Sequence, residues 1–148
     1  MPSVADAISA GARSESDVWA AALRSEPDWE PVFSPLAPEP LAAGMETVYE
    51  AYLVHYGRSR LFAPPDADEA VLLGDYLYAH GLVRIADAGG VPAVAAMAEL
   101  IARCAALRAD GVDGDGAAWV DAARALGGEP DEETVQRALA RHCARVAP

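Results

Sequence analysis

Two residues that could do proton chemistry stand on apolar faces of predicted helices. At about 100° per residue, Asp75 projects between Val71 and Ala79 and away from the polar side of its helix. His55 projects in the same way onto the apolar side of the preceding helix. Because a buried carboxylate is costly unless it is paired, we expect Asp75 to be largely buried and to accept a hydrogen bond from His55 or a tyrosine.

The chemistry of such a pair depends on what surrounds it. An aspartate orients a neighbouring imidazole and favours its charged form, and this arrangement serves both catalysis and structural cores. No nucleophile, second base or set of metal ligands accompanies His55 and Asp75 in the sequence. We therefore interpret them as a buried polar pair with a structural role and predict no catalytic residue.

The five tyrosines are further sources of hydrogen bonds. They are Tyr49, Tyr52, Tyr56, Tyr76 and Tyr78. We interpret them as core and rim residues and not as a cofactor cage, and their hydroxyls are alternative partners for Asp75. Tyr52, Tyr76 and Tyr78 are the candidates for lining a cavity or an interface.

Two groups of acidic residues have oxygen ligands but unsuitable spacing. The run from 110 to 115 carries three aspartates between glycines, yet it lacks the glutamate that a calcium loop places at its twelfth position. Glu46 and Glu50 lie one helical turn apart, as in di-iron bundles, but no Glu-x-x-His motif accompanies them. These patterns indicate a solvated turn and a solvated helical face.

Soft ligands are equally sparse. His142 and Cys143 are adjacent and Cys104 is distant, which falls short of a closed zinc site. Buried thiols and a surface histidine are the favoured interpretation. The sequence therefore predicts neither a metal site nor a cofactor.

Composition limits the class of protein. A chain of 148 residues suits one domain, and 11 basic against 23 acidic residues give a net charge of -12, which disfavours binding to nucleic acid. The two cysteines lack the density of a secreted disulfide framework. No signal peptide and no uncharged apolar run of about 18 residues is apparent, so we expect a cytoplasmic protein without a membrane span.

Apolar periodicity and Pro or Gly punctuation predict five or six helices and no strands. The predicted helices cover Ser14 to Arg24, Leu41 to Phe62, Asp68 to Ala88, Pro92 to Ala109, about Ala117 to Leu126, and a last helix from Asp131. Five prolines between 26 and 40 predict an extended connector, so residues 1–40 form an N-terminal helix and connector and residues 41–148 a helical body. Short links make the central helices mostly antiparallel neighbours.

Part of this body resembles the trans-polyprenyl diphosphate synthase family. The likeness rests on Tyr52-Leu53-Val54-His55 followed by Ala70-Val71-Leu72-Leu73-Gly74-Asp75-Tyr76-Leu77, and it covers roughly residues 44–110. In that family, a helix ending in Leu-Val/Ile-His leads into an aspartate-rich motif, and a later helix opens with Ala-Val-Leu-x-Gly-Asp-x-Leu. The resemblance implies an all-α bundle that corresponds to a fragment of the isoprenoid synthase fold.

The motif departs from the family where the chemistry would occur. Residues 56–60 replace the family's magnesium-binding aspartates with Tyr-Gly-Arg-Ser-Arg, and no carboxylate occurs between Glu50 and Asp66. The resemblance then implies a non-catalytic relative, acting as an interaction or accessory subunit or as an isoprenoid-binding remnant. Its partner would be a full-length prenyl synthase or a second copy. The alternatives are a reduced prenyltransferase that works with a partner subunit and an unrelated helical interaction domain.

Overall fold

The computed structural model describes residues 2–147 and is all-α. Its helices are α1 (Val4–Glu15), α2 (Asp17–Ala22), α3 (Glu39–Tyr56), α4 (Ala67–Asp110), α5 (Asp115–Ala125) and α6 (Glu132–Val146), with a short 3-10 helix η1 (Ser34–Leu36). Within residues 2–147 there is no strand, and the only β-type pairing is an isolated bridge between Leu23 and Phe62. The predicted all-α bundle is confirmed.

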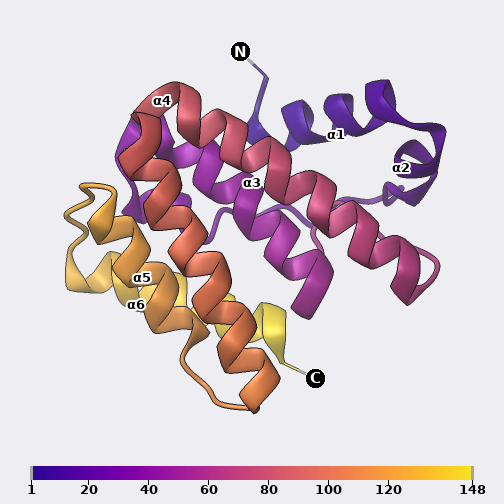
Figure 1. Cartoon of the computed structure of the whole chain (residues 1–148). Coiled ribbons are helices and arrows are strands. Elements are labelled where there is room, and N and C mark those ends of the chain that lie inside the picture. The colour runs from indigo at the N-terminus through magenta and orange to yellow at the C-terminus, as the bar shows by residue number, and fades with distance from the viewer. Residues whose placement is uncertain (1, 148) are drawn as a thin grey trace.

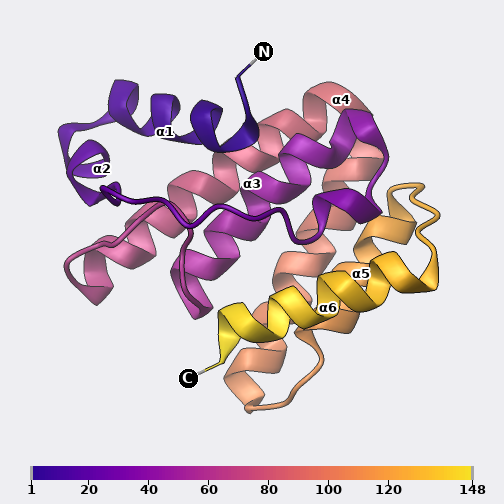
Figure 2. The same cartoon turned by 180° about the vertical axis from the view of Figure 1, so that it is seen from behind.

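α3 is the centre of the molecule. α4 packs along one side of it, while the connector after α2 crosses its other side before entering η1 (Figures 1 and 2). α5 and α6 form a second layer beside the distal half of α4 (Figure 1). Twelve residues of α3 are buried, so this helix is enclosed on all sides along most of its length.

Glycines set the close approach of α3 and α4. A Cβ atom on Gly44 would lie 2.8 Å from Ile85 Cδ1, and one on Gly81 would lie 3.0 Å from the backbone nitrogen of Val48. Such separations are shorter than side-chain contacts allow, so the backbones meet at these positions because no side chain stands between them.

α4 is bent into two arms at Gly90. This residue has φ 67° and ψ -161°, outside the helical region, and Pro92 follows it in the first turn of the second arm. The predicted division between Asp68 to Ala88 and Pro92 to Ala109 is therefore confirmed as a kink within one hydrogen-bonded run. By length and composition alone, α4 is long and apolar enough to cross a membrane. Only 22% of its most apolar stretch is buried in the fold, so much of its apolar surface faces outward.

The structure corrects two predicted helix boundaries. The N-terminal helix was predicted over Ser14 to Arg24, but α1 ends and α2 begins at Ser16, which is extended and whose Oγ accepts a bond from the amide of Val18. α3 was predicted to reach Phe62 and instead ends at Tyr56, because Gly57 leaves the helical conformation. Residues 57–66 consequently form a loop that turns back along the connector.

The core has two parts. The larger cluster gathers α3, the second arm of α4, α5 and α6 around Trp119, with Phe33 stacked on its ring at 5.4 Å. The smaller cluster joins α1 and α2 to the first arm of α4 and to Phe62. Val32, Phe33 and Leu36 of the connector are buried in the larger cluster, so the connector is part of the body's core.

Candidate functional site

The predicted contact between His55 and Asp75 is present at the interface of α3 and α4. Asp75 Oδ1 lies 3.3 Å from His55 Nε2, but the atoms are not aligned for a hydrogen bond. The His55 ring stacks on Tyr78 at 5.1 Å and covers Gly74, where a Cβ atom would come within 2.6 Å of His55 Cδ2. Burial lowers the pKa of His55, and the nearby charge of Asp75 only partly opposes this.

The predicted burial of Asp75 is wrong. Its side chain is 66% exposed, whereas that of His55 is only 13% exposed. The residues of the first arm that face α3 include Leu73, Leu77 and Ile85, all fully buried or nearly so. α4 is apolar on two sides, and the side that carries Asp75 is the one turned to solvent, so an apolar face was mistaken for a core face.

The three tyrosines proposed for a cavity or interface lie in different places. Tyr52 is buried in the centre of the larger cluster, and Tyr78 is half-buried against His55. Tyr76 lies on the opposite side of α4, where its ring is 5.9 Å from Trp19 and 4.4 Å from His80. The fold therefore does not bring these three residues into one site.

Glu46, Glu50 and Arg60 form a completely buried charged cluster, here called the arginine cluster. Arg60 Nε lies 3.2 Å from Glu50 Oε2, and Arg60 Nη1 donates to Glu46 Oε1. Arg60 also stacks its guanidinium on Trp29, 4.0 Å from the ring centroid. The prediction that both glutamates lie on a solvated face is wrong, because the loop after α3 folds back and inserts Arg60 between the connector and the helix.

The arginine cluster binds the connector to α3. Glu46 accepts hydrogen bonds from the amides of Val32 and Ser34, at 2.9 and 2.8 Å, and Arg60 Nη1 donates to the carbonyl of Glu30 at 2.9 Å. An extended, proline-rich segment cannot satisfy its own backbone groups, so side chains must do so where it is buried. The acidic i, i+4 pair on α3 was a signal for this role, but its cation lies in a loop whose path the sequence does not reveal.

A second charged cluster connects α3, α4 and α5. Asp115, only 5% exposed, accepts bonds from Tyr52 Oη and from Arg108 Nε, the latter at 2.7 Å. Arg108 Nη2 donates to Tyr52 Oη, also at 2.7 Å, which closes a three-membered network. The predicted solvated turn is therefore wrong for Asp115, which begins α5 and is drawn inward by Arg108 and Tyr52.

His142 is buried beside this network. Its Nδ1 lies 2.8 Å from Tyr49 Oη, and the residue is only 4% exposed. Burial lowers the pKa of His142 to about 4, although the charge of Asp115 opposes the shift, so the ring is neutral at physiological pH. The predicted surface histidine is therefore wrong, because α6 turns this position toward α3.

The cysteines differ in environment. Cys104 is buried as predicted, and burial raises its pKa to about 12. Cys143 is exposed, contrary to prediction, because it follows inward-facing His142 on the outer side of α6. Within residues 2–147, no three histidine, cysteine or acidic side chains lie close enough together to hold a metal ion.

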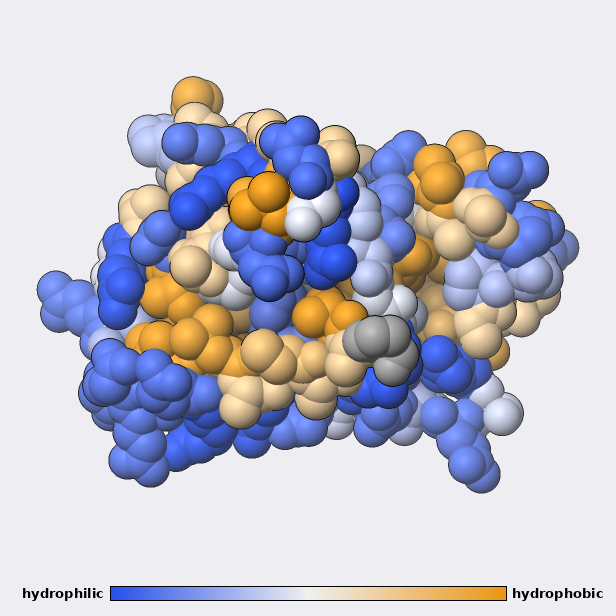
Figure 3. All heavy atoms as spheres, turned by 90° about the horizontal axis from the view of Figure 1, so that it is seen from below, coloured by the Kyte–Doolittle hydropathy of each residue, from blue (hydrophilic) through white to orange (hydrophobic). Residues whose placement is uncertain are grey.

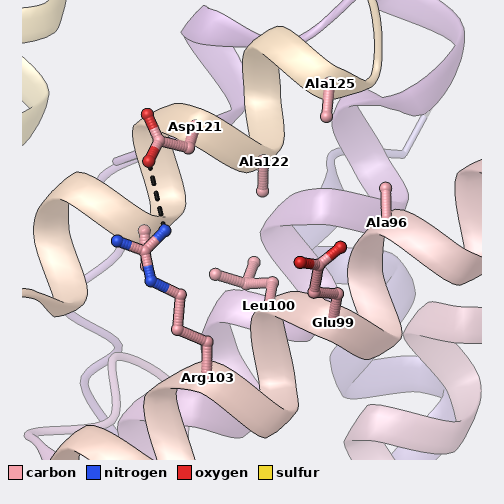
Figure 4. Close-up of a pocket in the computed structure, with 8 residues that line it drawn as sticks. Ala96, Glu99, Leu100, Arg103, Asp121, Ala122 and Ala125 are labelled. Carbon is pink, nitrogen blue, oxygen red and sulfur yellow. Dashed lines mark hydrogen bonds and ion pairs between the residues drawn. The ribbon is translucent and has the colours of Figure 1, made fainter.

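A small groove separates the second arm of α4 from α5 (Figure 4). Alanine side chains from both helices and Leu100 line it, and the Arg103–Asp121 ion pair closes one end at 3.1 Å. Both charged side chains are about half-exposed, so this is a surface contact of small energetic weight. The groove holds about 200 Å³, and none of its described lining residues has a buried polar side-chain atom without a hydrogen-bond partner.

Comparisons with protein-family models, with curated proteins and with solved structures found no match to this chain.

Proposed function

We propose that the protein is a non-catalytic, polyprenyl-synthase-like helical protein that acts as an interaction or accessory subunit. The observation that carries this proposal is a second apolar face on the first arm of α4, opposite the face packed on α3. This outer face of α4 consists of Val71, Leu72, Ala79, Val83 and Ala86. Three of its residues are large and more than half exposed: Val71 at 52%, Leu72 at 61% and Val83 at 60%.

An exposed apolar helical face favours contact with another protein surface. In the family that residues 44–110 resemble, the corresponding helices pack at the subunit interface. Asp68 and Asp75 lie within the outer face of α4 and Asp87 lies at its edge. Two copies would bring these acids together, so a different chain with basic side chains around an apolar patch fits better than a second copy. A full-length polyprenyl synthase is the partner we propose.

The arginine cluster supports the proposal that the chain is non-catalytic. Prenyl transfer requires carboxylates that hold magnesium against a diphosphate. After His55, residues 56–60 provide no carboxylate, and Glu46 and Glu50 of α3 are occupied by Arg60 and by the connector amides. A fixed guanidinium in this position repels a divalent cation, so the residues present do not fit the family's metal site.

A mixing experiment tests the interaction. The purified chain and a full-length polyprenyl synthase from the same organism are combined, and the molar mass is measured by light scattering after gel filtration. We expect a complex that the double variant Leu72→Glu, Val83→Glu no longer forms. The matched control is Ala102→Glu, Ala106→Glu, which places the same charges on exposed positions of the second arm. Failure of the wild-type chain to bind, or equal binding by both variants, would overturn the proposal.

An activity assay separates this proposal from the reduced prenyltransferase. The chain alone, the synthase alone and the mixture are each given an allylic diphosphate, isopentenyl diphosphate and magnesium. We expect no turnover by the chain alone. Turnover by the chain alone would contradict the proposal. Turnover by the mixture would also contradict it if neither the chain nor the synthase is active alone.

A further inference from the structure

A cleft of about 560 Å³ opens where α4 ends, between the loop into α5 and the C-terminal half of α6. Its size lies within the usual range for small-molecule sites. Leu107, Val112, Leu139 and Val146 provide apolar walls, and Asp115 and His142 face it from two different helices. The surface on this side of the molecule, seen from below, carries a band of apolar residues among hydrophilic ones (Figure 3).

Asp115 brings an unused hydrogen-bond acceptor to this cleft. Its Oδ2 receives the bonds from Arg108 and Tyr52, whereas its buried Oδ1 has no hydrogen-bond partner among residues 2–147. Leaving a buried carboxylate oxygen unpaired costs free energy, so such an atom calls for a donor. No side chain of the described residues supplies one.

His142 brings a donor to the same cleft. We assign the Tyr49 hydroxyl as the donor to His142 Nδ1, because no other side-chain hydrogen bond of this hydroxyl is found within residues 2–147. The neutral ring then carries its hydrogen on Nε2. No hydrogen bond from Nε2 is found within residues 2–147. Gly116 packs closely against the ring, because a Cβ there would be crowded at 3.3 Å from Cδ2. Asp115 and His142 thus face one cleft with an acceptor and a donor that do not bond each other.

The charges of the cleft determine the ligand class. At the inner wall of the cleft Arg108 neutralises Asp115 and His142 is uncharged, so these groups sum to zero, and the remaining charged lining residue, Asp113, is exposed to solvent. We infer that this cleft binds a small neutral molecule with a hydroxyl or amide group on an apolar skeleton. Its polar group donates to Asp115 Oδ1 and accepts from His142 Nε2, and its skeleton lies against the apolar walls. The site is separate from the outer face of α4 and does not depend on the proposed interaction.

Three probes of nearly equal shape test the inference. Benzyl alcohol carries the required hydroxyl, toluene lacks it, and benzylamine carries a positive charge. Each is titrated into the full ¹⁵N-labelled chain while amide shifts are followed by NMR. We expect saturable shifts at Arg108, Gly116 and Cys143 with benzyl alcohol. The other two probes should bind at least about fivefold more weakly. Equal affinity for toluene, tighter binding of benzylamine, or no saturable shift with benzyl alcohol would each overturn the inference.

Variants locate the binding. Cys143 is exposed and borders the cleft, so Cys143→Trp fills the opening without disturbing the core, and it is expected to abolish the shifts. Gln136→Trp adds the same side chain at an exposed position of α6 that does not line the cleft, and binding is expected to persist. Benzyl alcohol should also slow alkylation of Cys143 in the wild-type chain. Unchanged binding by Cys143→Trp, or unchanged alkylation at saturating probe, would show that this cleft is not the site.

Discussion

The guanidinium of Arg60 lies against the carboxylate of Glu50 with both side chains completely buried, and Nε is 3.2 Å from Oε2. Glu46 lies on the other side of the same guanidinium and is only 1% exposed. Two carboxylates thus share one buried cation, and backbone amides of the connector supply the remaining donors to Glu46. The position of the connector on α3 depends on this arrangement.

Arg60→Ala is therefore expected to be severely destabilising. It would leave Glu46 and Glu50 buried without their cation, and removing one partner of a buried ion pair costs about 3–5 kcal/mol. The matched control is Arg137→Ala, which breaks an exposed i, i+4 pair with Glu133 and should change stability by less than about 0.5 kcal/mol. Urea unfolding followed by circular dichroism measures both. Similar midpoints for the two variants would mean that the arginine cluster does not stabilise the fold.

Gly74→Ala is expected to destabilise the protein although it replaces a helical glycine by the best helix former. The new Cβ would lie within 2.6 Å of the His55 ring, which stacks on Tyr78 of the same helix as Gly74. Gly11→Ala is the matched control, because its Cβ would be an ordinary 3.7 Å from Tyr76 Oη. That variant should gain up to about 1 kcal/mol from helix propensity alone. Thermal unfolding should give shifts of opposite sign, and equal shifts would contradict the close approach of α3 to Gly74.

The helices could be predicted from the sequence, but the side of α4 that carries Asp75 was wrongly predicted to be buried. Both outcomes arise because the sequence signals used here are local. Gly90 and Pro92 act locally, through backbone conformation, so the kink in α4 could be located from the sequence. The buried face of α4 could be identified from the sequence only if the opposite side were polar. The first arm is apolar on two sides, so this signal was missing. The better signal was Gly74 and Gly81, since small residues mark where a neighbouring backbone approaches closely.

The charged clusters could not be predicted for a different reason. Glu46 and Asp115 look like solvated acids because their cations come from other elements, Arg60 from the loop after α3 and Arg108 from the end of α4. Helical periodicity describes one element at a time and contains no information about such partners. His142 was missed in the same way, since its partner Tyr49 lies on α3.

Asp75→Ala is now expected to have little effect on stability. The carboxylate is 66% exposed and has no aligned hydrogen bond to His55, so solvent screens the contact. The free energy of unfolding should change by less than about 0.5 kcal/mol. His55→Ala, in contrast, removes a largely buried ring from Tyr78 and should cost clearly more. A large loss in Asp75→Ala would restore the structural pair that the sequence predicted.

The two thiols should react at very different rates. Cys143 is exposed on α6, whereas Cys104 is buried and its pKa is raised to about 12, so it is protonated and shielded. A chromogenic disulfide reagent should modify one thiol rapidly in the native protein and the second only after denaturant is added. Cys143→Ser should remove the rapid phase, and Cys104→Ser should leave it intact. Two rapid thiols would contradict the packing of the second arm of α4.

Lowering the pH should reduce stability through His142. In the unfolded chain the His142 ring gains a proton near pH 6.5. In the folded chain burial lowers the pKa of His142 to about 4, because the charged ring would be poorly solvated. The unfolded state therefore binds more protons between these values, and stability falls as the pH decreases through this window. His142 should contribute a loss of about 2 kcal/mol between about pH 7 and pH 5.

His142→Asn isolates this contribution. The asparagine side chain does not titrate and can still accept a bond from Tyr49, so the variant should lose most of the dependence over this range even if it starts less stable. His55, whose pKa burial also lowers, accounts for part of the slope that remains. Urea denaturation at a series of pH values gives the slope for each protein. Parallel curves for wild type and His142→Asn would show that folding does not lower the pKa of His142, which would contradict its burial beside Tyr49.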